Sequence, residues 1–226
     1  MKRYSIIILC ICFSANCFSQ INEVGVFLGV SNYVGDIGST NYLRPKDAGV
    51  GLIYKWNLNP RIAFRGTYTY IPIKANDADS ENLVRQNRGL SFENTINEVA
   101  VGMEFNFFEY DLSSTDKTYT PYILFEIAAF DYQTVRPSPT VVGSFTFTRN
   151  TSLALPIGVG FKSKIYGKLA FAIETRVRYT FKDDLDYSTP DFPSLDFGGT
   201  GNDWYMFTGV SLVYTFGRPA CYSSRR

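Results

Sequence analysis

The amino-acid sequence predicts an all-β protein, an eight-stranded antiparallel up-and-down transmembrane β-barrel with long outer loops and short periplasmic turns. Eight segments of strand length carry bulky apolar side chains at every second position, which is the period of a β-strand. The positions between them hold charged and small side chains, which suit the crowded interior of a narrow barrel. The connections alternate between long and short, as they do in barrels that cross a membrane.

The first four segments are residues 23–34, 49–58, 61–71 and 95–107. The first two alternate less regularly than the other two. In the third, Phe64 and Tyr68 share one face while Arg65 lies on the other. In the fourth, Val99 belongs to the bulky set and Glu98 to the opposite face. Helical spacing fits none of these segments, and their β-branched and aromatic residues favour strands.

The last four segments are residues 121–130, 152–161, 168–179 and 203–216. The seventh alternates most cleanly, because Phe171 and Val177 oppose Glu174 and Arg176. The eighth ends at Phe216. Barrels of the outer-membrane type commonly close their final strand with an aromatic residue, so Phe216 marks the predicted end of the barrel.

One face of the predicted strands is bulky and apolar, and the other carries small and charged residues. This difference indicates which face points to lipid and which to the lumen. A soluble calycin-like barrel would also alternate, but it would expose Ala100, Gly102 and Ala170 at its surface, whereas small residues suit a crowded lumen better. An arginine facing the middle of a bilayer costs ~2–4 kcal/mol, so the charged parity is expected inside. There the charges can pair and plug the barrel, with a narrow channel as the open alternative. The predicted lumen charge network consists of Arg65, Glu98, Glu104, Glu126, Glu174, Arg176 and Arg178.

The connections predict an orientation in the bacterial outer membrane. The long ones, expected outside, are residues 35–48, 73–94, 131–151 and 181–202, and the shorter periplasmic ones are residues 59–60, 108–117 and 163–167. Eight strands place both termini on the periplasmic side. Aromatic residues near strand ends predict girdles at the membrane interfaces. The predicted girdle residues are Trp56, Tyr68, Tyr70, Tyr179, Trp204 and Tyr214.

Three parts follow one another along the chain. Residues 1–19 are predicted to be a secretory signal peptide, because Lys2 and Arg3 precede a short apolar run and a small-residue cleavage site. The apolar run is too short to span a bilayer. The other two parts are the predicted barrel, residues 20–216, and a periplasmic tail, residues 217–226.

The tail holds the candidate partner-binding residues Arg218, Cys221 and Tyr222. Removal of the signal leaves Cys221 as the sole cysteine of the mature chain, and a lone thiol in an oxidising compartment favours a disulfide with another protein. A free or buried thiol is the open alternative. A lipid-modified Cys17 is a weaker interpretation, because the preceding asparagine fits a lipobox poorly.

Composition excludes several classes of function. The chain has 22 Lys and Arg against 21 Asp and Glu, so no nucleic acid is predicted as a partner. It contains no histidine, which removes the imidazole base and most zinc and iron sites. The protein is therefore predicted to be no enzyme and to bind neither a metal nor a cofactor. The acidic last loop, with Asp183, Asp186 and Asp203, matches no calcium loop and is expected to be solvated.

Several short stretches together resemble one known family. They are residues 23–29 (EVGVFLG), 32–37 (NYVGDI), 43–45 (LRP), 87–92 (NRGLSF), 104–108 (EFNFF), 120–123 (TPYI), 156–160 (PIGVG) and the 180–187 segment around DDLD. Their order and spacing over nearly the whole mature chain resemble the PorG-like outer-membrane proteins of the type IX secretion system.

The resemblance implies a structural role. Proteins of this kind anchor the periplasmic ring built from PorK-like lipoproteins and PorN-like proteins, and the periplasmic turns and tail would then dock that ring. Two other classes stay open. One is a small ligand-binding or adhesion barrel that acts through its outer loops, and the other is a narrow channel.

Overall fold

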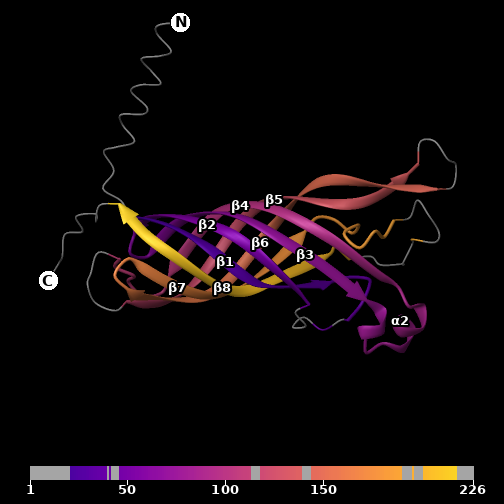
Figure 1. Ribbon diagram of the computed structural model, residues 1–226, viewed down its shortest axis with the longest axis horizontal. Helices are drawn as coiled ribbons and strands as arrows, with labels where there is room; N and C mark the ends of the chain where they lie inside the picture. Colours follow the sequence, from indigo (N-terminus) through magenta and orange to yellow (C-terminus); the bar gives the residue numbers. More distant parts are fainter. Residues whose placement is uncertain are drawn as a thin grey trace, which may run out of the picture.

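The computed structural model describes residues 21–39, 41, 46–112, 118–138, 144–189, 195 and 201–217. Within these ranges each strand pairs antiparallel with the next, and the last strand pairs with the first, so that eight strands form a closed barrel (Figure 1). The predicted fold class is therefore confirmed. The strands are β1 (Ile21–Val34), β2 (Asp47–Asn59), β3 (Ile62–Asn76), β4 (Ser91–Asn106), β5 (Tyr119–Pro137), β6 (Phe145–Tyr166), β7 (Leu169–Thr180) and β8 (Trp204–Gly217).

The barrel has two different ends. At one end Ile21 of β1 lies opposite Gly217 of β8, and we call this the terminal end. The connections β2–β3, β4–β5 and β6–β7 also lie there. The other four connections lie at the opposite end, which we call the loop end (Figure 1). There a 3₁₀ turn, η2 (Asp77–Asp79), and a short helix, α2 (Leu83–Arg88), join β3 to β4.

The helix α2 was not predicted from the sequence, because it is only one and a half turns long. Asn82 caps its start by accepting a hydrogen bond from the Val84 amide, and Gly89 ends it in the left-handed conformation at φ 68°. Among the residues that the structure describes, no helix is both long enough and apolar enough to cross a bilayer.

Two predicted outer loops and one predicted turn are wrong in part, because the strands are longer than the alternation of apolar residues indicated. β6 reaches Tyr166, so most of the predicted turn at residues 163–167 is strand. β3 and β4 reach Asn76 and Ser91, so strand, η2 and α2 fill most of residues 73–94. β5 and β6 reach Pro137 and Phe145, so most of residues 131–151 is a β-hairpin. The extensions at the loop end rise above the apolar belt, where both faces of a strand can be polar and the sequence pattern of a membrane strand ends.

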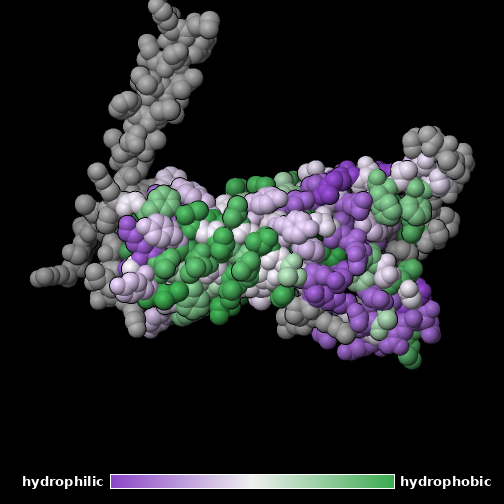
Figure 2. All heavy atoms as spheres, in the orientation of Figure 1, coloured by the Kyte–Doolittle hydropathy of each residue, from purple (hydrophilic) through white to green (hydrophobic). Residues whose placement is uncertain are grey.

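The outer and inner faces are as different as the sequence indicated. Val101 is 63% exposed on the outside, whereas its neighbour Ala100 is 1% exposed in the lumen. On the face that Figure 2 shows, apolar side chains gather over the part of the barrel nearest the terminal end, and hydrophilic side chains gather at the loop end. An apolar surface of this extent needs acyl chains around it. The strand positions with bulky apolar side chains face outward, and the barrel has the surface of an integral outer-membrane protein.

Small residues are required in the lumen where strands approach one another closely. A Cβ atom added to Gly102 of β4 would overlap the carbonyl oxygen of Phe125 on β5. Glycine at this position therefore leaves room for the large charged side chains that fill the barrel.

Candidate functional site

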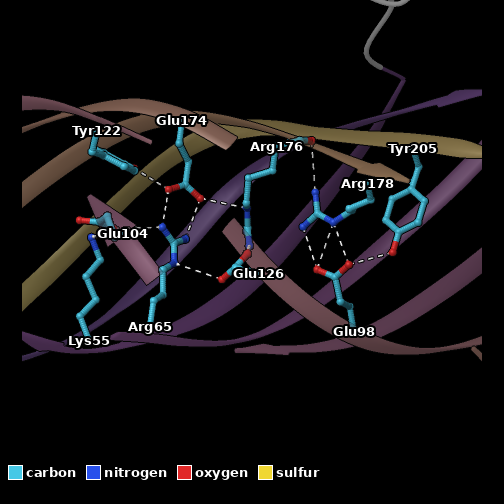
Figure 3. Close-up of polar contacts among 10 residues, drawn as sticks. All are labelled: Lys55, Arg65, Glu98, Glu104, Tyr122, Glu126, Glu174, Arg176, Arg178 and Tyr205. Atoms are coloured by element: carbon cyan, nitrogen blue, oxygen red, sulfur yellow. Dashed lines mark hydrogen bonds and ion pairs between the residues drawn. The ribbon is translucent and has the colours of Figure 1, made fainter. Parts of the chain in front are cut away.

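The centre of the lumen is occupied by a bidentate ion pair. Arg65 of β3 donates to both carboxylate oxygens of Glu174 of β7, at 2.6 and 2.7 Å (Figure 3). The Tyr122 hydroxyl donates a third hydrogen bond to Glu174, at 2.5 Å. These side chains are buried, so the pair crosses the barrel interior away from water and lipid.

A second arginine extends this pair along the barrel axis. Arg176 of β7 contacts Glu174 at 3.0 Å and Glu126 of β5 at 3.3 Å. Glu126 also lies 3.8 Å from the Arg65 guanidinium. The Arg176 guanidinium covers the ring of Phe27 at 5.0 Å, so part of its flat surface packs on an aromatic side chain.

Nearer the loop end, two side chains donate hydrogen bonds to one carboxylate. Arg178 of β7 donates to Glu98 of β4 through both Nε and Nη2, at distances from 2.8 to 3.1 Å. The Tyr205 hydroxyl of β8 donates to the same carboxylate at 2.8 Å. This is the fork geometry in which arginine binds a carboxylate most strongly.

Nearer the terminal end, Glu104 of β4 binds two lysines that the sequence analysis missed. Lys55 of β2 lies 2.8 Å from it, and Lys162 of β6 is hydrogen-bonded to it. Lys162 also covers the ring of Tyr110, at 4.4 Å. Lys55 shares the inward parity of Ile53, and this signal could have identified it. Lys162 follows the predicted sixth segment by one residue, so the predicted boundary excluded it.

The structure joins all seven predicted lumen residues, with Lys55 and Lys162, into one network, because Arg65 contacts Glu104 at 3.5 Å and Arg178 donates to the Arg176 carbonyl at 3.4 Å. The predicted girdle residues lie on the outer surface. Trp56 and Tyr214 lie toward the terminal end, Tyr68 and Tyr70 lie toward the loop end, and the half-buried Tyr179 packs against Trp204 there at 4.8 Å between ring centroids. The signal peptide, the tail and the candidates Arg218, Cys221 and Tyr222 lie outside the described residues.

The network is suited to filling the barrel. Its arginines and lysines are each in contact with a carboxylate. A nucleophile or general base would need a carboxylate or hydroxyl that is free to meet a substrate. In the described part of the chain, no three Asp, Glu, Cys or His residues are grouped so that they could hold a metal ion.

The loop end carries a second, acidic cluster that corrects one expectation. Asp186 and Asp203 of the last loop are buried rather than solvated. The Asp203 carboxylate accepts a hydrogen bond from the Leu185 amide at 3.0 Å and another from the Tyr33 hydroxyl. Burial, together with the nearby charge of Asp186, raises the pKa of Asp203 to about 8. The reason is that the Leu185 side chain is buried in the mouth of the barrel. Asp186, which follows it in the sequence, and Asp203, which binds its amide, are therefore buried as well.

A third buried carboxylate, Asp77 of η2, connects the first two loops of the loop end. It accepts hydrogen bonds from the amides of Gly38 and Leu90 and from the guanidinium of Arg88. Burial opposes the charge of Asp77, but these hydrogen bonds outweigh it and lower the pKa of its carboxyl.

Comparison with protein families then identifies the chain. The model of a family described as a domain of unknown function (DUF6089) matches residues 2–225. The chain belongs to the DUF6089 family. Comparison of this DUF6089 chain with curated proteins finds no match.

Solved structures of small outer-membrane proteins are similar to this DUF6089 chain. Neisserial surface protein A shares 11% identity at a TM-score of 0.48, over 87% of this chain and 96% of that chain. Ail of Yersinia pestis shares 13% identity at 0.46, over 88% of this chain and 100% of that chain. The N-terminal barrel of Pseudomonas aeruginosa OprF shares 9% identity at 0.46, over 88% of this chain and 98% of that chain. Identities this low do not transfer a function.

Proposed function

We propose that this protein is a non-catalytic structural component of the type IX secretion machinery, which anchors a periplasmic ring of PorK-like and PorN-like proteins to the outer membrane. One observation carries the proposal. The ion pairs from Lys55 and Glu104 at one end to Arg178 and Glu98 at the other occupy the lumen. Because the lumen side chains bind one another, a partner would have to bind at the ends or the outer wall of the barrel.

The terminal end is the proposed docking side, and it faces the periplasm in this proposal. Two of the three connections there are short, between Asn59 and Ile62 and between Tyr166 and Leu169, and residues 107–118 between β4 and β5 form the longer one. The tail that follows β8 contributes Arg218, Cys221 and Tyr222, with Cys221 available for a disulfide to a ring protein. The resemblance to PorG-like proteins supports the choice of partner.

The proposal is tested by affinity purification from detergent extracts of membranes, followed by mass spectrometry. We expect the full chain to retain PorK-like and PorN-like proteins, and a chain truncated after Gly217 to retain much less of them. A control deletion removes residues 138–144 from the loop end instead. The proposal fails if no ring protein is enriched with the full chain, or if both truncations behave alike.

The disulfide is tested separately by non-reducing electrophoresis of the same membranes. We expect a high-mass species that disappears on reduction and in the Cys221→Ser variant. If the variant and the unchanged chain migrate identically, Cys221 forms no intermolecular disulfide, and the docking proposal then rests on non-covalent contacts.

A further inference from the structure

At the loop end the hairpin of β5 and β6 separates from β4 and extends beyond the end of β7 (Figure 1). β4 stops pairing with β5 at Asp131, and β7 stops pairing with β6 at Ala154. The pairing between β5 and β6 continues to Pro137 and Phe145. Among the described residues, the stretch 146–153 of β6 is therefore paired with a strand on the β5 side only. We call the other side the β6 edge.

The backbone groups of the β6 edge can be assigned, because hydrogen bonds in an antiparallel ladder alternate between the two sides of a strand. The Ser138 amide donates to the Ser144 carbonyl at 2.8 Å, so even-numbered residues of β6 address β5. Odd-numbered residues address the opposite side, where Leu155 pairs with Tyr179 of β7. The residues that present their amide and carbonyl groups at the β6 edge are Phe147, Arg149, Thr151 and Leu153.

Most of these groups have no hydrogen-bond partner among the residues that the structure describes. No described residue hydrogen-bonds the backbone of Phe147, Arg149 or Leu153 from the side of the β6 edge. The Thr151 amide is turned toward the side chain of its neighbour Asn150, at 3.0 Å. An unpaired row of this kind is a template for another strand.

The side chains of this segment favour strand pairing and do little to prevent it. Phenylalanine and threonine alternate from Phe145 to Thr148, and such residues have high β-propensity. Phe147 is 54% exposed. Natural edge strands are commonly protected by lysine, proline or a bulge. Here the charge of Arg149 is held by Asp131 at 2.6 Å, and the pairing between β5 and β6 runs without a bulge.

The geometry points to a docking site at the β6 edge for an extended segment of another polypeptide, which adds to the sheet as a strand above the end of β7. Membrane lipid cannot satisfy the edge, because a strand needs alternating donors and acceptors along its length. A second copy is disfavoured. In one membrane the β6 strands of two copies run in the same direction, and the parallel pairing this imposes is the weaker kind. A flexible segment can pair antiparallel and place β-branched or aromatic side chains beside Phe147 and Leu153.

The probe for this site is a nine-residue peptide of alternating threonine and valine, N-methylated at every second amide. Such a peptide has one edge that can form hydrogen bonds, so it can extend a sheet without aggregating. The control is the same peptide methylated at every amide. Amide hydrogen exchange of the full chain in lipid nanodiscs is the measurement. At a concentration ten times its Kd, we expect the probe to slow exchange of Phe147 and Arg149 by about tenfold and the control to have no effect.

Two variants isolate the backbone donor. Arg149→Thr removes only the ion pair with Asp131, whereas Arg149→Pro also removes an amide that points to the β6 edge and leaves the bonds to β5 intact. We expect Arg149→Thr to bind the probe and Arg149→Pro to lose most of that binding. Equal binding by both variants overturns the inference. So does exchange at Phe147 and Arg149 that is already slow without the probe, or that slows as the barrel itself is concentrated, because the edge is then occupied by this protein.

Discussion

Glu98 illustrates how single residues hold the lumen together. Its carboxylate receives hydrogen bonds from Arg178 and Tyr205 and is fully buried. Burial of the Glu98 carboxylate is compensated by the positive charge of the Arg178 guanidinium, and burial of Arg178 is compensated by Glu98. Truncation of one partner leaves the other charge buried and unpaired, so it destabilises the protein more than removal of both.

Replacing Glu98 with alanine is expected to lower the free energy of unfolding by about 3–5 kcal/mol, because Arg178 is left buried without a counter-charge. The double variant Glu98→Leu, Arg178→Leu should be less destabilised than the single one. Urea unfolding in lipid vesicles measures both. Val99→Ala, on the lipid-facing side of the same strand, is the control. A loss below about 1 kcal/mol for Glu98→Ala would contradict the buried pairing.

Asp203 predicts a pH dependence at the loop end. Its pKa is about 8 in the folded protein, whereas an unfolded aspartate has a pKa of about 3.9. Folding therefore favours the neutral form. The stability that this form contributes is complete below about pH 4 and is lost as the pH rises toward 8.

The Leu185 amide, which donates to Asp203, reports on this change. Its hydrogen exchange, corrected for the intrinsic effect of pH, should be slower at pH 5 than at pH 9. The difference should shrink in Asp203→Asn and persist in Asp131→Asn, which alters an exposed carboxylate. An unchanged pH response in Asp203→Asn would show that another group titrates.

At the scale of elements, the sequence predicted the parts of strands that face lipid and missed the parts that do not. Alternation identified β4 because its outer residues are apolar from Val99 onward. The upper hairpin was missed because its alternating stretch, residues 145–148, is short and because Phe147 and Thr148 are both exposed there. The helix α2 was missed because its only marks are the caps Asn82 and Gly89, which also occur in ordinary turns.

The contact between the first two loops depends on Asp77. We expect Asp77→Ala to release α2 and the Gly38 region at a local cost of about 1–3 kcal/mol, because buried amides lose their acceptor. Faster exchange of the Gly38 and Leu90 amides, with an unchanged barrel, is the expected result. Asp79→Ala is the matched control, since Asp79 forms a more exposed ion pair with Lys46. Equal effects of the two variants would contradict the role of Asp77.

At the scale of the whole molecule, the filled lumen predicts an insulating barrel. Arg65 and Glu174 span the interior, and Arg176 and Glu126 continue the blockade along the axis. In planar bilayers the purified protein should carry no steady ionic current. Arg176→Ala, which opens space beside Glu126, is expected to raise current above that level. Steady conductance of the unchanged protein would instead favour the narrow channel.

The site was more predictable than the function. Parity alone marked Arg65 and Glu174 as inward-facing, because strand geometry assigns a side to every residue. Which acid meets which base depends on the stagger between strands, and alternation carries no information about stagger. The identity of a partner is harder still to predict from these residues, because side chains in a filled lumen would not contact it.

The charges that meet inside the barrel come from strands that are far apart along the chain. Arg65 belongs to β3 and Glu174 to β7, and Glu98 of β4 needs Arg178 of β7. A partly assembled cylinder lacking β7 would present Glu98 to the bilayer without Arg178, and it would leave Arg65 with only its longer contacts, to Glu104 at 3.5 Å and Glu126 at 3.8 Å. Insertion one hairpin at a time is therefore penalised. Biogenesis should be concerted, with nearly complete sheets closing as they enter the membrane.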